Sequence, residues 1–174
     1  MPIFLAPYIS PHAIDAAVYS VSSEMKTLAS SQDRDEILCR LAKLTPGAAP
    51  RWGQMTVGEM LCHLSDSFRV SLGQKRVTYT ATWFTRSVYK WAALWSPFPW
   101  PHGVETAREL DQRIGGTPPV QFEADLAELR HLLQLFCTSG EDFRAHAFFG
   151  HLTRRERMRH AYRHMDHHLR QFVV

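Results

Sequence analysis

Apolar residues recur at three- and four-residue spacing in four separate segments of this chain, which is the periodicity of amphipathic helices. The segments begin near Asp33, Thr56, Phe122 and Thr153. The rest of the sequence shows no convincing alternation of polar and apolar residues, so strands are not expected. Four long amphipathic helices in one domain predict an all-α fold, a four-helix bundle whose sites are built from side chains on facing helices.

Two of the expected helices begin with capping boxes. The segments TVGE (residues 56–59) and TRRE (residues 153–156) place a Thr three positions before a Glu, so that each side chain can bond to the other residue's backbone N–H. The first helix is predicted to begin with Asp33 as its N-cap and to end at residues 46–47, which are Pro-Gly.

A long irregular connection is expected between the second and third helices, over residues 73–116. It includes a predicted apolar helical stretch at residues 85–94 and a short polar helix at residues 105–113. Between them, residues 96–103 read SPFPWPHG, and the three prolines require a loop. Long loops in compact domains are often functional or cover something, and the aromatic residues here favour packing or a dimer surface over a substrate lid.

Residues 1–24 are expected to form an N-terminal extension to a single domain of residues 25–174. The extension is apolar but lacks a basic start and is interrupted by prolines, so it is a poor signal peptide. The sequence contains no run of the ~20 apolar residues that span a bilayer, and no membrane partner is expected. Three cysteines without a CxxC pair favour a reducing compartment, which predicts a cytoplasmic location.

Histidines are concentrated near the end of the chain, and their spacing suggests a metal site. His164 and His168 are four residues apart on the fourth predicted helix, so their side chains share one face with Cβ atoms about 5–6 Å apart. This spacing lets two imidazoles bind one ion. His63, at the border of the apolar stripe of the second helix, is the best candidate for a third ligand. Three imidazoles would leave open positions on the ion.

Other interpretations of these histidines stay open on spacing alone. A histidine at the edge of an apolar stripe is more often a hydrogen-bonded core residue than a ligand. His160 lies one turn before His164 on the same stripe and could replace one of the pair. His167 points about a quarter-turn away from this face and is expected to be exposed.

Three polar residues are candidates to accept the second N–H of a ligand imidazole, which fixes its tautomer. Asp66 and Glu59 share the helix face of His63, and Gln171 lies three residues after His168. Glu59 is already committed to the capping box, and Asp66 is expected more often at the surface than behind a ligand.

Two segments, WGQMTVGEMLCHLSDS (residues 52–67) and FFGHLTRRERMRHAYRHMDHHLRQF (residues 148–172), resemble the DinB/YfiT-like superfamily of metal-binding four-helix bundles. The resemblance covers about residues 25–174, and its specific part is the HxxHHLRQF tail. It implies one ligand on the second helix and two on the fourth, at His63, His164 and His168. The extension of residues 1–24 is a departure that the resemblance does not explain.

The resemblance also implies a function, because related branches of this superfamily include thiol-dependent transferases and isomerases. We expect a metal-dependent enzyme that binds Zn²⁺, Ni²⁺ or Fe²⁺ and acts on a small-molecule substrate, with a low-molecular-weight thiol as one candidate. Thiol-dependent transfer is slightly favoured over hydrolysis because no general base is visible. The alternative is a non-catalytic metal-binding or stress-associated bundle, and the protein could form a homodimer.

Five arginines between residues 154 and 163 make the start of the fourth helix basic, against the helix dipole. A solvated face usually accounts for such a cluster, and an anionic substrate tail is the alternative. The net charge is only +3, and no recognisable nucleic-acid motif is present, so no nucleic-acid partner is expected.

Overall fold

Helices form all of the regular structure in residues 25–140 and 143–174, which are the residues that this computed structural model describes. The predicted extension, residues 1–24, lies outside them. The described part contains five α-helices and no strand, so the prediction of an all-α fold is confirmed. The helices are α1 Ser31–Leu41, α2 Val57–Ser71, α3 Lys90–Trp95, α4 Phe122–Thr138 and α5 Arg154–Gln171.

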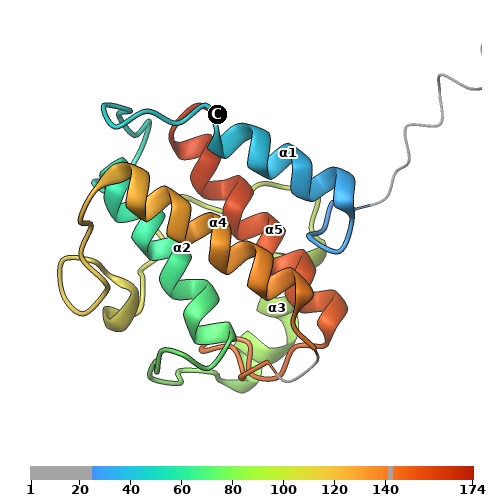
Figure 1. The fold of residues 1–174 in the computed structure, drawn as a ribbon. Helices are drawn as coiled ribbons and strands as arrows, with labels where there is room; N and C mark the ends of the chain where they lie inside the picture. Colours follow the sequence, from blue (N-terminus) through green and yellow to red (C-terminus); the bar gives the residue numbers. More distant parts are fainter. Residues whose placement is uncertain (1–24, 141–142) are drawn as a thin grey trace, which may run out of the picture.

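The longer helices pack in two pairs around one core. Helix α2 lies along α4, and α1 lies along α5, which also contacts α2 and α3 (Figure 1). Burying one large apolar side chain contributes about 1.5–3 kcal/mol, and the core contains many such side chains. Those that are almost fully buried include Ile37, Leu41, Met60, Leu61, Leu64, Leu129, Phe136, Met158, Met165 and Leu169.

Both predicted capping boxes are present. The Thr56 hydroxyl accepts from the Glu59 N–H at 3.2 Å, and the Glu59 carboxylate accepts from the Thr56 N–H at 2.7 Å. Thr153 and Glu156 exchange the same two bonds at 3.3 and 2.9 Å. These boxes define the first turns of α2 and α5, the two helices that carry the predicted ligands.

The predicted limits of the first helix are wrong at both ends. Its N-cap is Ser30, whose hydroxyl accepts from the Asp33 N–H at 3.3 Å. The Asp33 carboxylate instead accepts from the Thr27 N–H at 2.8 Å, so it holds the preceding turn. The helix ends at Leu41 rather than at residues 46–47, because the N–H groups of residues 43 and 44 bond to carbonyls three residues back.

The connection between α2 and α4 is irregular, as predicted, but one expected helix is missing from it. Residues Thr85–Tyr89 form a π-helical turn that leads directly into α3, close to the predicted stretch. The polar helix expected at residues 105–113 is reduced to one 3₁₀ turn at Arg108–Leu110. Asp111 has an extended backbone, and its carbonyl accepts from the N–H groups of residues 114–116, so the chain turns instead of continuing the helix.

A buried carboxylate fastens both ends of this connection to α2. Asp66 is 0% exposed and accepts from Lys75 Nζ at 2.6 Å, near the start of the connection. Near its end, the Thr117 N–H and hydroxyl donate to the same carboxylate at 2.8 and 2.7 Å. Arg69, on α2 itself, is a further donor to this carboxylate at 3.1 Å. These bonds hold the connection against α2, beside the predicted site.

Most of the arginines near the start of α5 do not form the solvated face that was expected, although Arg155 is exposed. Arg154 donates to the carbonyl of Ser139 at 2.7 Å, at the C-terminal end of α4. Arg159 donates to the carbonyl of Leu94 at 2.9 Å, and Arg163 to that of Ser96 at 2.6 Å. These side chains therefore attach neighbouring segments to α5 through carbonyl groups that helix ends and loops leave unpaired.

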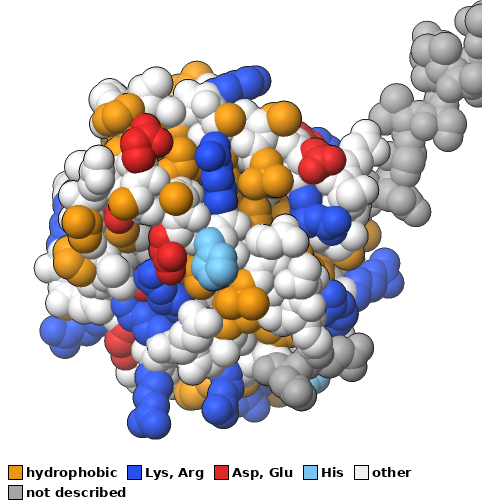
Figure 2. All heavy atoms as spheres, viewed as in Figure 1, with side chains coloured by type: hydrophobic (Ala, Val, Ile, Leu, Met, Phe, Trp, Pro, Cys, Tyr) orange, Lys and Arg blue, Asp and Glu red, His pale blue; other side chains and the backbone are white. Residues whose placement is uncertain are grey.

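The face of the molecule that carries α1 and α4 has basic and acidic side chains interspersed with apolar ones (Figure 2). This mixture is typical of a solvated surface. Within the described residues, none of the helices is long and apolar enough to cross a membrane.

Candidate metal centre

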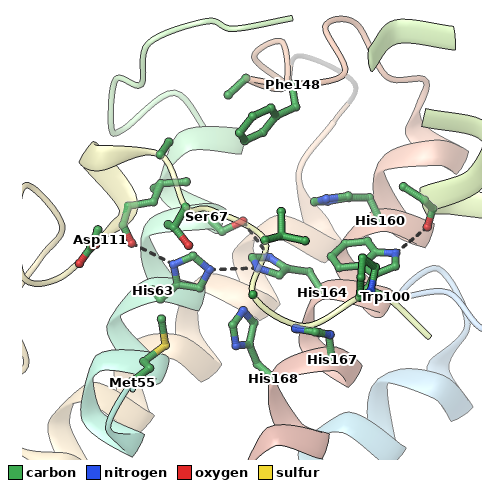
Figure 3. A pocket seen from close by; sticks show the side chains of 18 of the residues that line it. Met55, His63, Ser67, Trp100, Asp111, Phe148, His160, His164, His167 and His168 are labelled. Atoms are coloured by element: carbon green, nitrogen blue, oxygen red, sulfur yellow. Dashed lines mark hydrogen bonds between the residues drawn. The ribbon is translucent and has the colours of Figure 1, made fainter. Parts of the chain in front are cut away.

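The structure brings together the three histidines that the sequence singled out. His63 comes from the middle of α2, and His164 and His168 come from successive turns of α5 (Figure 3). One ring nitrogen of each residue lies within 4.8 Å of those of the other two. The three ring centroids form a nearly equilateral triangle with sides of 5.0, 4.8 and 4.9 Å.

Each of these rings has an oxygen behind it, on the side of Nδ1. His63 Nδ1 lies 2.9 Å from the Leu110 carbonyl, and His168 Nδ1 lies 3.1 Å from Gln171 Oε1. His164 Nδ1 lies 3.3 Å from the Ser67 hydroxyl. Because carbonyl oxygens only accept, His63 and His168 carry their proton on Nδ1, which leaves the Nε2 lone pair free.

The amide of Gln171 is itself held in place. Its Nε2 donates to the Trp52 carbonyl at 2.8 Å, so its oxygen must face His168. The neighbouring Gly53 has a φ of +75°, and a Cβ there would lie 3.1 Å from Gln171 Nε2. A glycine at this position therefore suits both the backbone conformation and the close approach of the amide.

The spacing of the nitrogens is compatible with one small divalent ion. Nitrogen–zinc bonds of about 2.0–2.1 Å at angles near 90–110° place two ligand nitrogens about 2.9–3.4 Å apart. His63 Nε2 and His164 Nε2 are 3.0 Å apart, within this range. One nitrogen from each of the three histidines lies within 4.8 Å of the other two. The His168 ring would therefore need to turn slightly toward the other two rings for all three nitrogens to reach one ion.

Burial keeps these imidazoles in the neutral form that a metal ligand requires. Loss of solvation lowers the pKa of His63, and it holds the pKa values of His164 and His168 well below the ordinary value of 6.5. Each of the latter two is lowered further by its neighbouring imidazoles. The three rings are therefore neutral near pH 7, as metal binding requires.

The structure does not bring His160 or His167 into this group. His160 packs against His146, with ring centroids 4.5 Å apart, and against Trp100. His167 was expected to be exposed, which is wrong, because it is half-buried beside Trp52. Trp100 and His102 of the connection also lie against His167, with ring centroids 6.0 and 6.1 Å away, and cover part of it.

Of the three polar residues predicted to lie behind the candidate ligands, only Gln171 is hydrogen-bonded to one of these histidines. Asp66 is occupied by the ends of the connection. Glu59 is bound to Arg113 at 2.9 Å in addition to its capping box, and this guanidinium lowers the pKa of Glu59 to about 2. Both carboxylates therefore stabilise the fold and do not orient a histidine ring.

Sequence reasoning missed two of the groups that hold the rings, and it missed them for different reasons. The Leu110 carbonyl is a backbone group in an irregular segment, so the sequence carries no signal for it. Ser67 lies four residues after His63 on α2, and that spacing could have identified it as a neighbour on the same face.

The three histidines lie on the wall of a cavity of about 530 Å³. This volume falls within the range of small-molecule sites. The wall combines α2, α5 and the long connection, and much of it is aromatic. Its aromatic members include Trp52, Tyr89, Phe98, Trp100, Phe148 and Phe149. Trp100 and Phe148 are seen beside the histidines in Figure 3.

Comparison with known proteins identifies the family of this chain. Residues 24–174 match the model of the family described as Protein of unknown function (DUF1569), and the chain belongs to that family. No curated protein and no solved structure matches the chain.

Proposed function

We propose that this protein is a DinB/YfiT-like four-helix bundle, formed by α1, α2, α4 and α5, that binds one divalent metal ion through His63, His164 and His168. The packing of α2 on α4 and of α1 on α5 supports this arrangement. Three imidazoles suit Zn²⁺, Ni²⁺ and Fe²⁺ alike. The remaining positions of the ion would face the cavity, where a small-molecule substrate binds.

The observation that carries the proposal is the common orientation of the rings. An oxygen lies next to each Nδ1, and ligand nitrogens from two helices converge at the cavity wall. A hydrogen-bonded partner behind each imidazole is the usual arrangement of metal-binding histidines. Histidines that serve only the core have no need to direct one ring nitrogen each toward a common point.

A bound ion with open positions could activate water or hold a thiolate. The residues of the chain would keep the three lone pairs in place, exclude bulk water through the aromatic wall and orient the substrate. Among the described residues, no carboxylate is hydrogen-bonded to the three histidines, and Glu59 is held by Arg113. Without a poised general base, transfer to or from a small thiol fits the site better than hydrolysis.

Metal analysis tests the proposal directly. We expect about one equivalent of Zn²⁺, Ni²⁺ or Fe²⁺ in the purified full-length protein, measured by inductively coupled plasma mass spectrometry. His63→Ala and His168→Ala should each lose most of it. His151→Ala is the matched control, because His151 is exposed on the segment before α5. A wild-type protein that takes up no metal, or variants that retain it fully, would overturn the proposal.

A non-catalytic metal-binding bundle is the alternative function. It would share the site and the metal content but would have no use for an open cavity beside the ion. The cavity of about 530 Å³ therefore favours the enzyme.

A further inference from the structure

A buried arginine lies on the same cavity wall as the three histidines. Arg157 belongs to the first turns of α5 and is only 3% exposed. Its spacing of seven residues from His164 and eleven from His168 places all three on one face of the helix. With a rise of about 1.5 Å per residue, Arg157 lies about 10 Å from His164 along the helix axis.

The charge of Arg157 has no counterion among the described residues. One terminal nitrogen donates to the Arg144 carbonyl at 2.6 Å, and the other lies 3.3 Å from the Ser71 hydroxyl. Nε is buried and has no acceptor among residues 25–140 and 143–174. No described carboxylate lies within 4.0 Å of the guanidinium. The guanidinium lies over the Phe143 ring, 5.1 Å from its centroid, and this ring is the only described group that offsets its charge apart from the hydrogen bonds. Arginine is almost never buried without a charged partner, because a buried charge loses its hydration.

The other arginines of α5 show that Arg157 is not simply one more structural attachment. Arg154, Arg159 and Arg163 also donate to backbone carbonyls, but none of them has a buried N–H without an acceptor in the described structure. Burial lowers the pKa of Arg157 to about 10, so the guanidinium still carries its charge at neutral pH.

The surroundings of Arg157 suit the carboxylate end of an apolar molecule. Val70, Val77 and Tyr89 line the same cavity. His146 adds a neutral N–H donor to this wall. Its Nδ1 accepts from the N–H groups of Phe148 and Phe149 at 3.2 and 3.3 Å, so its proton is on Nε2. Burial and the charge of Arg157 lower the pKa of His146 to about 3 and keep it neutral.

We propose that Arg157 binds the carboxylate of the substrate, so that this end of the cavity selects small apolar acids whose reacting group lies about 10 Å away, at the three histidines. One guanidinium matches one planar monoanion, and its unpaired Nε–H supplies the missing bond. Because Nε is closed to water in this conformation, the side chain must turn slightly to receive the anion. The inference rests on the proposed function, since it takes the cavity as the substrate site.

Matched neutral and anionic probes test this assignment without requiring turnover. Octanoate and octanamide would be titrated into full-length protein by isothermal titration calorimetry, both as purified and after chelation of metal. We expect octanoate to bind at least about tenfold more tightly than octanamide, as is usual for a hydrogen bond to a charged group. Arg157→Gln should abolish this preference, and Arg157→Lys should keep part of it.

Arg155→Gln is the matched control, because it removes the same charge from an exposed position two residues away on the same helix. Circular dichroism would show whether Arg157→Gln folds. If it does not, Arg157→Lys gives the second test, because it keeps the charge but not the Nε–H, and an undiminished preference in that variant would contradict the assignment. Equal binding of the two probes, no binding of either, or a preference that survives in Arg157→Gln would overturn the assignment.

The two proposals fail separately. Loss of the carboxylate preference in a protein that holds stoichiometric metal removes only the role of Arg157. A metal-free protein that still prefers octanoate through Arg157 removes only the metal centre.

Discussion

Nε2 of His63 lies 3.0 Å from Nε2 of His164, although the two residues are 101 positions apart in the chain. This approach depends on the contact between α2 and α5. It also depends on a carbonyl from the long connection, because Leu110 holds the far side of the His63 ring at 2.9 Å. Three parts of the chain therefore cooperate to bring these two ring nitrogens together. Because the rings are already oriented, the free-energy cost of ordering side chains when a ligand or ion binds is smaller.

Replacing Gln171 should weaken metal binding without removing a ligand. Gln171→Leu deletes the oxygen that fixes the His168 ring, and we expect the affinity for Zn²⁺ to fall about 10- to 100-fold with an unchanged stoichiometry at saturation. Competition with a chromophoric chelator would measure both quantities. Gln134→Leu, at an exposed position of α4, is the control. An unchanged affinity in Gln171→Leu would contradict the role given to this amide.

Removal of metal should leave the fold in place. The core of α1, α2, α4 and α5 is apolar and does not include the three histidines, so burial rather than the ion stabilises the helices. After chelation we expect an unchanged far-ultraviolet circular dichroism spectrum at 25 °C and a lower melting temperature. A free ion at 100 times its Kd stabilises the native state by about 2.7 kcal/mol. Loss of the helical signal would favour the non-catalytic alternative, in which the ion is structural.

Asp66→Asn should destabilise the protein strongly. The substitution leaves Lys75 and Arg69 facing a neutral group in a buried place, and breaking such a pair costs about 3 kcal/mol. Urea unfolding at pH 7 would measure the loss. Asp35→Asn, at an exposed position of α1, should change the free energy of unfolding little. A small effect at Asp66 would mean that the connection is held by other contacts.

The same carboxylate predicts a pH dependence. Burial acts to raise the pKa of Asp66, but the Lys75 ammonium and the Thr117 N–H and hydroxyl outweigh it and bring the pKa below the ordinary value of 3.8. Its stabilising contribution is therefore complete above about pH 3.8, the value in the unfolded chain, and is lost as the pH falls through the folded pKa. Asp66→Asn should flatten this part of the curve of stability against pH.

Thr153→Ala should remove one half of the capping box of α5. The Thr153 hydroxyl accepts from the Glu156 N–H at 3.3 Å, and loss of an N-cap side chain typically costs about 1 kcal/mol. Thermal unfolding followed by circular dichroism would detect this change. Thr80→Ala, on the exposed part of the connection, serves as the control. Equal melting temperatures for the two variants would show that α5 does not depend on this cap.

Local patterns predicted those features that depend on neighbours in the chain. The apolar spacing identified the long helices, and the two capping boxes located the starts of α2 and α5. The four-residue spacing placed His164 and His168 on one face of α5. Errors occurred at helix ends, where hydrogen bonds formed outside the helix decide where it begins or stops. Asp33 bonds to the turn before α1, and the predicted helix at residues 105–113 gives way to a turn at Asp111.

The sequence by itself determined the all-α class, the helix starts and the pairing of two histidines, because these follow from periods of three and four residues. Only the tertiary structure decided that His63 meets that pair, that Leu110 and Ser67 hold the rings, and that Arg157 shares the cavity wall. Each of these depends on how α2, α5 and the connection pack together. Contacts between distant segments are set by burial and by the pairing of backbone groups in loops, which leave no periodic signal in the chain.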